Sequence, residues 1–273
     1  MPDSNNRIIN PRVRLNMRIS RNTMAFAVSD HTAVNQVVFE PYIVKSGISL
    51  AANLREAFKD SALLNRGYQR AQVLIDSPVL MIPIQEFDEA AKETLYHHAI
   101  TGLEGCVVLH SVLPDLNAVA VFSINKDLKL VIDDHFEDVR FVHLVQPVWS
   151  LLYQRSHTGM HRKLYAYYHD KRLEVFGFDK NRFRFCNTFD ASHSRDAVYF
   201  VLYAWKQIGL DAQNDELYIA GDIPDREWTI DALRTYCRKA YLINPVAEFN
   251  RAPVTQIKGM PFDLQTLFVK GGG

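Results

Sequence analysis

The sequence predicts a mixed α/β protein made of two similar halves. Short apolar stretches, alternating or continuous, predict strands, and longer stretches with apolar residues every three or four positions predict helices. The order strand, strand, strand, helix, strand, helix occurs twice, with matching elements roughly 145 to 150 residues apart, about one domain length. With 273 residues, the chain is long enough for two domains and a sizeable core.

In the first half, three short strands joined by tight polar turns predict an antiparallel meander. The first strand alternates apolar residues with Arg12, Arg14, Asn16 and Arg18, a pattern typical of a half-buried strand. The next apolar period predicts a helix that Ser49 can cap. The strand after it lacks alternation, as expected when both faces are covered. In chain order the predicted ranges are 12–20, 23–30 and 35–45 for the meander, 46–64 for the helix and 71–78 for the covered strand.

The second half repeats this order, and its helix can be capped by Ser192 or Ser194. Its predicted ranges are 163–169, 172–179 and 182–189 for the meander, 192–210 for the helix and 215–225 for the covered strand and its exit loop. Between the copies we predict helices over 88–100, 126–135 and 147–155 and strands over 106–113, 117–124 and 139–145. A last helix is predicted over 225–240, before a partly ordered tail from residue 251.

A polar stretch, 155–162, separates the copies and predicts domains 1–155 and 156–273. Two copies of this element order resemble the duplicated ribonuclease-H-like unit of the actin, heat-shock chaperone and sugar-kinase superfamily. The second half is also similar to the actin-like domains of pilus-assembly and type II secretion proteins. Nearly the whole chain resembles a bacterial family of uncharacterised cytoplasmic proteins with an actin-like ATPase fold. The resemblance implies two domains flanking a cleft, and such interfaces are common ligand sites.

Members of that superfamily that hydrolyse ATP use a turn with Asp and Gly after the first strand of each half, because glycine lets backbone N–H groups approach phosphates. Here the first turn is Ser20-Arg21-Asn22, with neither residue type. The second is His169-Asp170-Lys171, with an Asp but no Gly. The adenosine loop, usually Gly-Gly, here has Gly221 followed by Asp222. The resemblance therefore implies a nucleotide site made of Asp170, Lys171, Gly221 and Asp222, if one is retained.

Each of these residues also has a simpler explanation. Asp170 is either a metal or water ligand or a hairpin-turn residue, and Asp is common in such turns. Lys171 is either a phosphate contact or a solvated turn residue. Gly221 and Asp222 follow a strand, where ligands of α/β sheets bind, but a glycine there also simply makes a turn. We favour the turn interpretation throughout, name no catalytic residue, and expect no metal site.

Composition excludes several classes of protein. Lys+Arg and Asp+Glu are both 31, whereas dedicated nucleic-acid binders are usually basic. Three separated cysteines without a CxxC pair indicate neither a zinc site nor a disulfide framework and fit a reducing compartment. We see no signal-peptide pattern and no apolar run of about 18 residues that would span a bilayer. The expected location is the cytoplasm, without membrane insertion.

Three functional hypotheses follow. The first is a non-catalytic binding or assembly module that has a protein partner or self-associates, with no established cofactor. The second is an ATPase or small-molecule kinase with an atypical phosphate site, taking ATP and magnesium. The third, a nucleic-acid module, would use Arg12, Arg14 and Arg18, which alternation places on one strand face, with Arg7 and Arg21 nearby. The alternative for these arginines is a solvated strand face. We favour the first hypothesis and do not expect nucleic acid as a partner.

Overall fold

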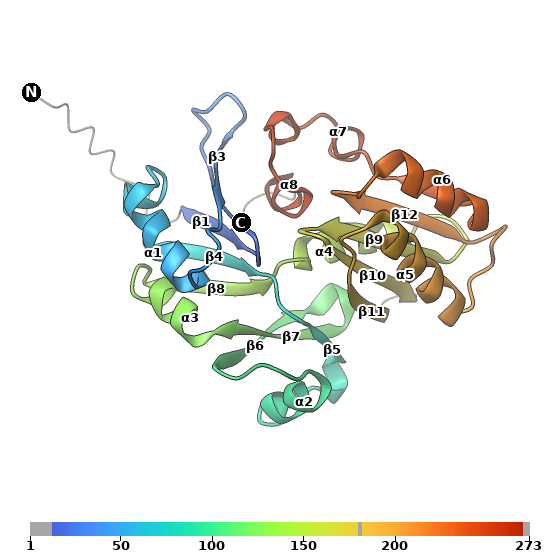
Figure 1. Cartoon of the computed structure of the whole chain (residues 1–273), viewed down its shortest axis with the longest axis horizontal. Helices are drawn as coiled ribbons and strands as arrows, with labels where there is room; N and C mark the ends of the chain where they lie inside the picture. Colours follow the sequence, from blue (N-terminus) through green and yellow to red (C-terminus); the bar gives the residue numbers. More distant parts are fainter. Residues whose placement is uncertain (1–12, 180–181, 270–273) are drawn as a thin grey trace, which may run out of the picture.

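The computed structural model describes residues 13–179 and 182–269, and it contains the predicted repeat (Figure 1). Each half has a five-stranded mixed sheet with its first strand in the middle. The first sheet has the spatial order β3 (Val37–Ile43), β2 (Thr23–Ser29), β1 (Arg14–Ile19), β4 (Arg70–Ile75) and β8 (Asp138–His143). The second has the order β11 (Arg182–Asp190), β10 (Arg172–Asp179), β9 (Lys163–His169), β12 (Glu216–Gly221) and β13 (Lys239–Leu242).

The pairing is the same in both sheets. β1 pairs antiparallel with β2 and parallel with β4, and β9 pairs antiparallel with β10 and parallel with β12. The helices of the two halves are α1 (Leu50–Asp60), α3 (Lys126–Asp133), α4 (Gln146–Ser156), α5 (Ser194–Gln207), α6 (Arg226–Tyr236), α7 (Pro245–Glu248) and α8 (Phe262–Val269). A smaller unit is inserted after β4 and contains β5 (Leu80–Pro83), α2 (Lys92–Ala99), β6 (Cys106–Leu113) and β7 (Ala118–Asn125).

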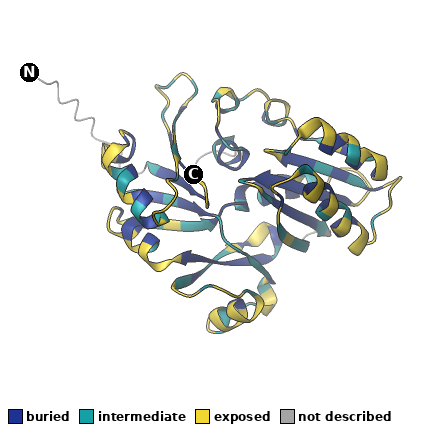
Figure 2. Cartoon of the chain, in the orientation of Figure 1, coloured by how far each residue is buried: buried dark blue, intermediate teal, exposed yellow. Residues whose placement is uncertain are grey.

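Apolar residues form layers that hold the halves together. One cluster packs α1 and α3 on the first sheet, and another packs α5 and α6 on the second. A third, the central cluster, lies between the two sheets and includes Trp149 of α4, Tyr165 of β9 and Leu264 of α8, all fully buried. Figure 2 shows the buried first part of α8 in the middle of the molecule. The space between the halves is therefore largely filled by side chains of the chain itself.

Local signals explain most element boundaries. Ser49 caps α1, because its side chain accepts a hydrogen bond from the Ala52 N–H. The predicted caps of α5 are wrong: His193 stands at the N-cap and makes no side-chain cap bond. The helix predicted over 225–240 ends at Tyr236, where the chain turns into β13. The predicted domain boundary falls at the end of α4, between the sheets, and stays a prediction.

The exposed arginine face predicted for β1 is wrong for the described residues. The Arg14 side chain is 10 % exposed and bonds Asp138, and the Arg18 side chain is 2 % exposed. Alternation failed because β1 is the central strand of its sheet and is covered on both faces. Arg21 is exposed, and Arg7 and Arg12 lie outside the described residues. The arginine face that the nucleic-acid hypothesis needs is therefore missing at Arg14 and Arg18.

No helix within the described ranges combines the length and apolar character needed to cross a membrane.

Candidate functional site between the two halves

Arg18, near the end of β1, is the centre of a buried ionic cluster that joins three parts of the chain. Its Nε lies 2.9 Å and 3.0 Å from the two carboxylate oxygens of Asp263 in α8. Its Nη2 donates to Asp170 Oδ2 at 2.7 Å. Its Nη1 donates to Thr23 Oγ1 at 3.0 Å. Burial alone would lower the pKa of Arg18, but Asp263 and Asp170 raise it above its usual value. The guanidinium therefore stays charged, and each of its three nitrogens has a hydrogen-bond acceptor.

Asp263 connects both halves through α8. Its side chain is 0 % exposed, and Oδ2 also accepts a hydrogen bond from the Tyr167 hydroxyl of β9 at 2.7 Å. The pKa of Tyr167 is raised well above its usual value, first by burial and then by the neighbouring carboxylate. Tyr167 is therefore a protonated donor. Hydrogen bonds of this kind to a buried charge are among the stronger ones in proteins.

Asp170 lies in the β9–β10 hairpin, whose two central residues both have left-handed backbone angles. φ is 46° at Asp170 and 64° at Lys171, as a type I′ turn requires. The Asp170 oxygens are both used, because Thr23 Oγ1 donates to Oδ1 at 2.9 Å. Burial raises the pKa of this carboxyl, but His169, Arg18 and Thr23 lower it by more, so it stays ionised. Lys171 is exposed and has no ion pair with another described residue.

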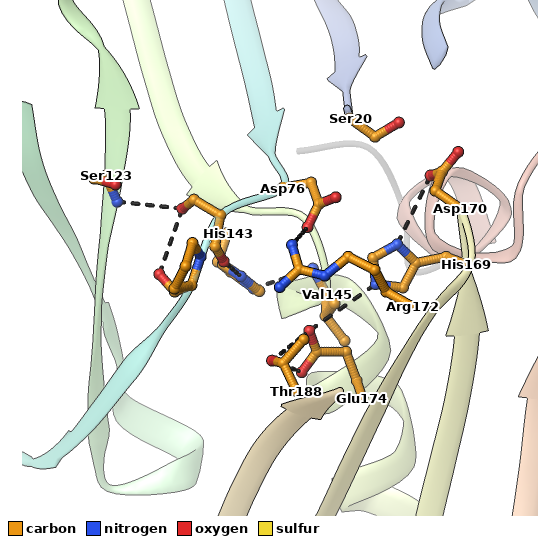
Figure 3. A network of polar contacts seen from close by, with 12 residues as sticks. Ser20, Asp76, Ser123, His143, Val145, His169, Asp170, Arg172, Glu174 and Thr188 are labelled. Carbon is orange, nitrogen blue, oxygen red and sulfur yellow. Dashed lines mark hydrogen bonds and ion pairs between the residues drawn. The ribbon is translucent and has the colours of Figure 1, made fainter. Parts of the chain in front are cut away.

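A second group of charges meets the first at Asp170 and lies at the ends of strands of both halves (Figure 3). Arg172, at the start of β10, donates to Asp76 Oδ1 at 2.8 Å. Asp76 follows β4 of the first half, so this ion pair also bridges the halves. Asp76 is 1 % exposed and Arg172 13 % exposed in their side chains. The Asp76–Arg172 pair therefore lies largely out of solvent.

His169 lies between two carboxylates in this group. Its Nδ1 is 3.7 Å from Asp170 Oδ2, and its Nε2 is 4.0 Å from Glu174 Oε1. Glu174 is 0 % exposed, and the Thr188 hydroxyl lies 2.8 Å from both of its oxygens. Burial raises the pKa of Glu174. Both His169 nitrogens are buried without a hydrogen-bond partner. Such unsatisfied polar groups are costly, and they often occur at functional sites.

His143, at the end of β8, lies next to this second group of charges. Its hydrogen bonds fix a single protonation state. Its Nε2 donates to the Ser77 carbonyl oxygen at 2.8 Å, and its Nδ1 accepts from the Val145 N–H at 3.3 Å. This pattern needs a proton on Nε2 and none on Nδ1. The ring stacks on Trp149 at 4.9 Å. Burial lowers the pKa of His143 to about 4, so the imidazole is neutral near pH 7.

Gly221 and Asp222 lie beside the ionic cluster, at a cavity that Tyr167 also lines. Gly221 has φ +91°, and a Cβ there would lie 1.9 Å from the Tyr168 carbonyl oxygen. Close approach of β12 to β9 therefore requires glycine here whether or not a ligand binds. Burial raises the pKa of Asp222. The cavity has a volume of about 390 Å³ and is also lined by Arg226, Phe262 and Gln265. Gln265 Oε1 is buried without a hydrogen-bond partner.

The two turns do not offer a site that fits magnesium and phosphate in this arrangement. Neither turn contains glycine, and both oxygens of Asp170 are bonded within the chain. Among the described residues, no group of three or more His, Cys, Asp or Glu side chains could hold a metal ion. The structure puts Asp170 and Lys171 in the β9–β10 hairpin, and Gly221 and Asp222 at the end of the neighbouring strand β12, beside the cavity. Their roles stay predictions.

Sequence reasoning missed the two residues that dominate the site, Arg18 and Asp263. Arg18 was assigned to an exposed face by alternation. Asp263 belonged to a tail expected to be only partly ordered, yet five of the eight residues in 262–269 are apolar and the run has the length of a short helix. That run was the one local signal that could have indicated a packed element.

Comparison with solved structures identifies the fold as that of the actin-like ATPases. A Bacteroides thetaiotaomicron protein described as having an actin-like ATPase fold and unknown function matches with a TM-score of 0.79 and 24% identity. The match covers 91% of this chain and 97% of that one. A PilM–PilN type IV pilus biogenesis complex matches with a TM-score of 0.53 and 10% identity, over 86% of this chain and 89% of that one. At these identities the likeness shows the fold alone.

A protein-family model matches residues 3–240, which is most of the chain. The chain belongs to DUF3822, the family described as a protein of unknown function. No curated protein matches the chain. The expected resemblance to a bacterial family with an actin-like ATPase fold and no assigned activity is confirmed.

Proposed function

We propose that the chain is a non-catalytic actin-like protein that acts as a binding or assembly module. The observation that carries this proposal is the bonding of Arg18. Its guanidinium takes up both Asp170, the only acidic residue of the two turns, and Asp263 of α8. A carboxylate already paired with a buried arginine is a poor ligand for magnesium or for an attacking water, because breaking the pair exposes an uncompensated charge.

The position of α8 supports the same conclusion. Phe262, Asp263 and Leu264 are buried in contact with groups of both halves. In this arrangement side chains of the protein itself occupy much of the space between the two sheets. A nucleotide spanning both turns would have to displace α8 or Arg18.

Thermal unfolding with and without millimolar Mg-ATP, Mg-ADP and a non-hydrolysable analogue tests the proposal. We expect no rise in the unfolding midpoint that depends on Asp170, and no ATP turnover. A ligand at 100 times its dissociation constant adds about 2.7 kcal/mol, which for a chain of this size raises the midpoint by several degrees. A rise of that size that is abolished by Asp170→Ala would overturn the proposal and support an ATPase or kinase with an atypical phosphate site.

Nucleotide binding without turnover is the second candidate, and the cavity beside Gly221 favours it. Its volume of about 390 Å³ lies within the usual range of ligand pockets, and Asp222 and Gln265 supply polar atoms. Here the midpoint should rise with Mg-ADP in the wild type but not in Asp222→Ala. Asp231→Ala, an exposed carboxylate of α6, is the matched control and should behave as the wild type.

We propose self-association as the binding activity, through an aromatic surface of the second half. The surface is formed by Tyr199 and Tyr203 of α5, which are both exposed and whose rings stack with their centres 6.2 Å apart. Exposed aromatic groups are enriched at protein interfaces. Sedimentation velocity over a range of concentrations should detect a dimer, and the double variant Tyr199→Ser, Tyr203→Ser should weaken it. A chain that stays monomeric at every concentration would redirect the search to other protein partners.

The proposed location is the cytoplasm. The three cysteines are free in the structure, as is usual in a reducing compartment. This location stays a prediction.

A further inference from the structure

A cavity of about 530 Å³ lies on the first half, at the point where α1 and α3 end. Its floor is made by Leu64, Tyr68 and Phe136, which belong to the cluster between the helices and the first sheet. None of the residues of the ionic cluster lines it. The volume is within the range of about 300 to 1,000 Å³ that is typical of small-molecule pockets.

An aromatic pair forms one side of this cavity. The rings of Phe58 and His135 stack with their centres 3.7 Å apart and their planes at 15°. His135 Nδ1 donates to the Val131 carbonyl oxygen at 2.7 Å, which orients the imidazole. His135 is exposed and makes no second ring contact within the described residues. The outer face of the ring can therefore stack on a planar ligand group.

Two cations stand at the edge of the same cavity. Arg55 and Lys59 are four residues apart on α1, so their side chains lie on the same side of the helix. Both are exposed, and neither makes an ion pair or hydrogen bond with another described residue. None of the nine lining residues is acidic. The cavity thus offers two cations without a direct ion pair to an anion, and Glu56 is a carboxylate in electrostatic contact with Lys59.

Asn65 adds a directional polar group. Its Nδ2 donates to the Ser61 carbonyl oxygen at 2.9 Å, which fixes the amide and leaves Oδ1 as an acceptor. An acceptor beside a stacking face suits a ring that carries an N–H or amino group. Together the lining residues present an apolar floor, one stacking face, one acceptor and two cations.

We propose that this cavity binds a phosphorylated compound with a planar nitrogen-containing ring, such as a nucleoside monophosphate. The ring stacks on His135, and the phosphate lies between Arg55 and Lys59. Base–aromatic stacking tolerates any flat ring, whereas guanidinium and ammonium groups select the phosphate. The proposal is independent of the function proposed above, because it uses no residue from between the halves.

Calorimetric titration of the full chain with AMP, adenosine and inorganic phosphate tests the proposal. AMP should bind at least about tenfold more tightly than either fragment, the equivalent of ~1.4 kcal/mol. The double variant Arg55→Ala, Lys59→Ala should weaken AMP binding by about tenfold or more, again ~1.4 kcal/mol. His135→Ala should weaken AMP binding but leave phosphate binding unchanged. The charge-matched control Arg195→Ala, Lys206→Ala removes two exposed cations of α5 and should bind AMP as the wild type does.

Three results would overturn the proposal. They are no saturable AMP binding at millimolar concentration, AMP binding that the Arg55, Lys59 double variant leaves unchanged, and equal affinities for AMP and inorganic phosphate. Loss of AMP binding in Asp222→Ala, with the double variant unaffected, would instead assign the nucleotide to the cavity beside Gly221. That last outcome would support the second candidate function and not this site.

Discussion

Replacing Arg18 by Met removes the cation that holds the two halves and α8 together, while keeping a long side chain in its place. Asp263 is 0 % exposed and the Asp170 side chain 8 % exposed, so neither carboxylate can be solvated without movement. Removing one partner of a buried ion pair typically costs about 3–5 kcal/mol, because the other charge is left uncompensated. We expect the free energy of unfolding to fall by an amount in that range. The fall should be near the upper end, because two carboxylates lose the same partner.

Urea unfolding followed by circular dichroism at pH 7 measures this loss. Arg14→Met is a matched control in the same strand, because the Arg14 side chain is only 10 % exposed but its partner Asp138 is 44 % exposed in its side chain. That control should cost clearly less, because solvent can take over the charge of Asp138. The reasoning is refuted if Arg18→Met loses no more stability than Arg14→Met.

A second variant and a pH series separate the ionic effect from a packing defect. Adding Asp263→Leu to Arg18→Met removes one of the uncompensated carboxylates and should recover part of the loss. The pKa of Asp170 is lowered in the folded wild type, so its ion pair stabilises above the unfolded value of about 3.8 and is lost as pH falls through the folded pKa. Without Arg18 that pKa rises, and the deficit of the variant should shrink below about pH 4. A deficit that does not change with pH would indicate packing alone.

The other predictions concern His143, Gly221 and Tyr167. The pKa of His143 is lowered from 6.5 to about 4 in the folded protein. As the pH falls, the unfolded chain therefore takes up a proton at this histidine before the folded chain does. The free energy of unfolding should drop by about 3 kcal/mol between pH 6.5 and 4 for this reason. The stability gap between the wild type and His143→Gln, measured by urea unfolding, should narrow by that amount, and a constant gap would contradict the assignment. Gly221→Ala should cost about 3 kcal/mol or more through the clash and backbone strain, against about 1 kcal/mol for Gly209→Ala, where φ is +64° and a Cβ meets no atom within 4 Å. Equal losses would be inconsistent with the close approach of β12 to β9. Tyr167→Phe should cost about 1.5 to 3 kcal/mol by removing a hydrogen bond to buried Asp263, and a loss below 0.5 kcal/mol would argue against that bond.

Local sequence patterns were enough to predict most elements and their repetition. Apolar periods predicted the central strands, and the strand 163–169 is reproduced at both ends by β9. Turn residues predicted the hairpins, and Ser49 predicted a helix start, because capping and periodicity depend on residues close together in the chain. The repeated order, together with the resemblance drawn from it, was enough to indicate the actin-like fold that the comparisons confirm.

The roles of the charged residues depend on contacts between segments far apart in the chain. Arg18 is 152 residues from Asp170 and 245 residues from Asp263, so no local pattern could indicate that they meet. The alternation of apolar and polar residues describes a single strand. It could not indicate that α8 packs against the polar side of β1. The burial of Asp263 depended on α8 entering the space between the halves, and the cost of burying that carboxylate is offset by Arg18 and Tyr167. The candidate site was therefore set by contacts between distant segments, whose energies no short stretch of sequence contains.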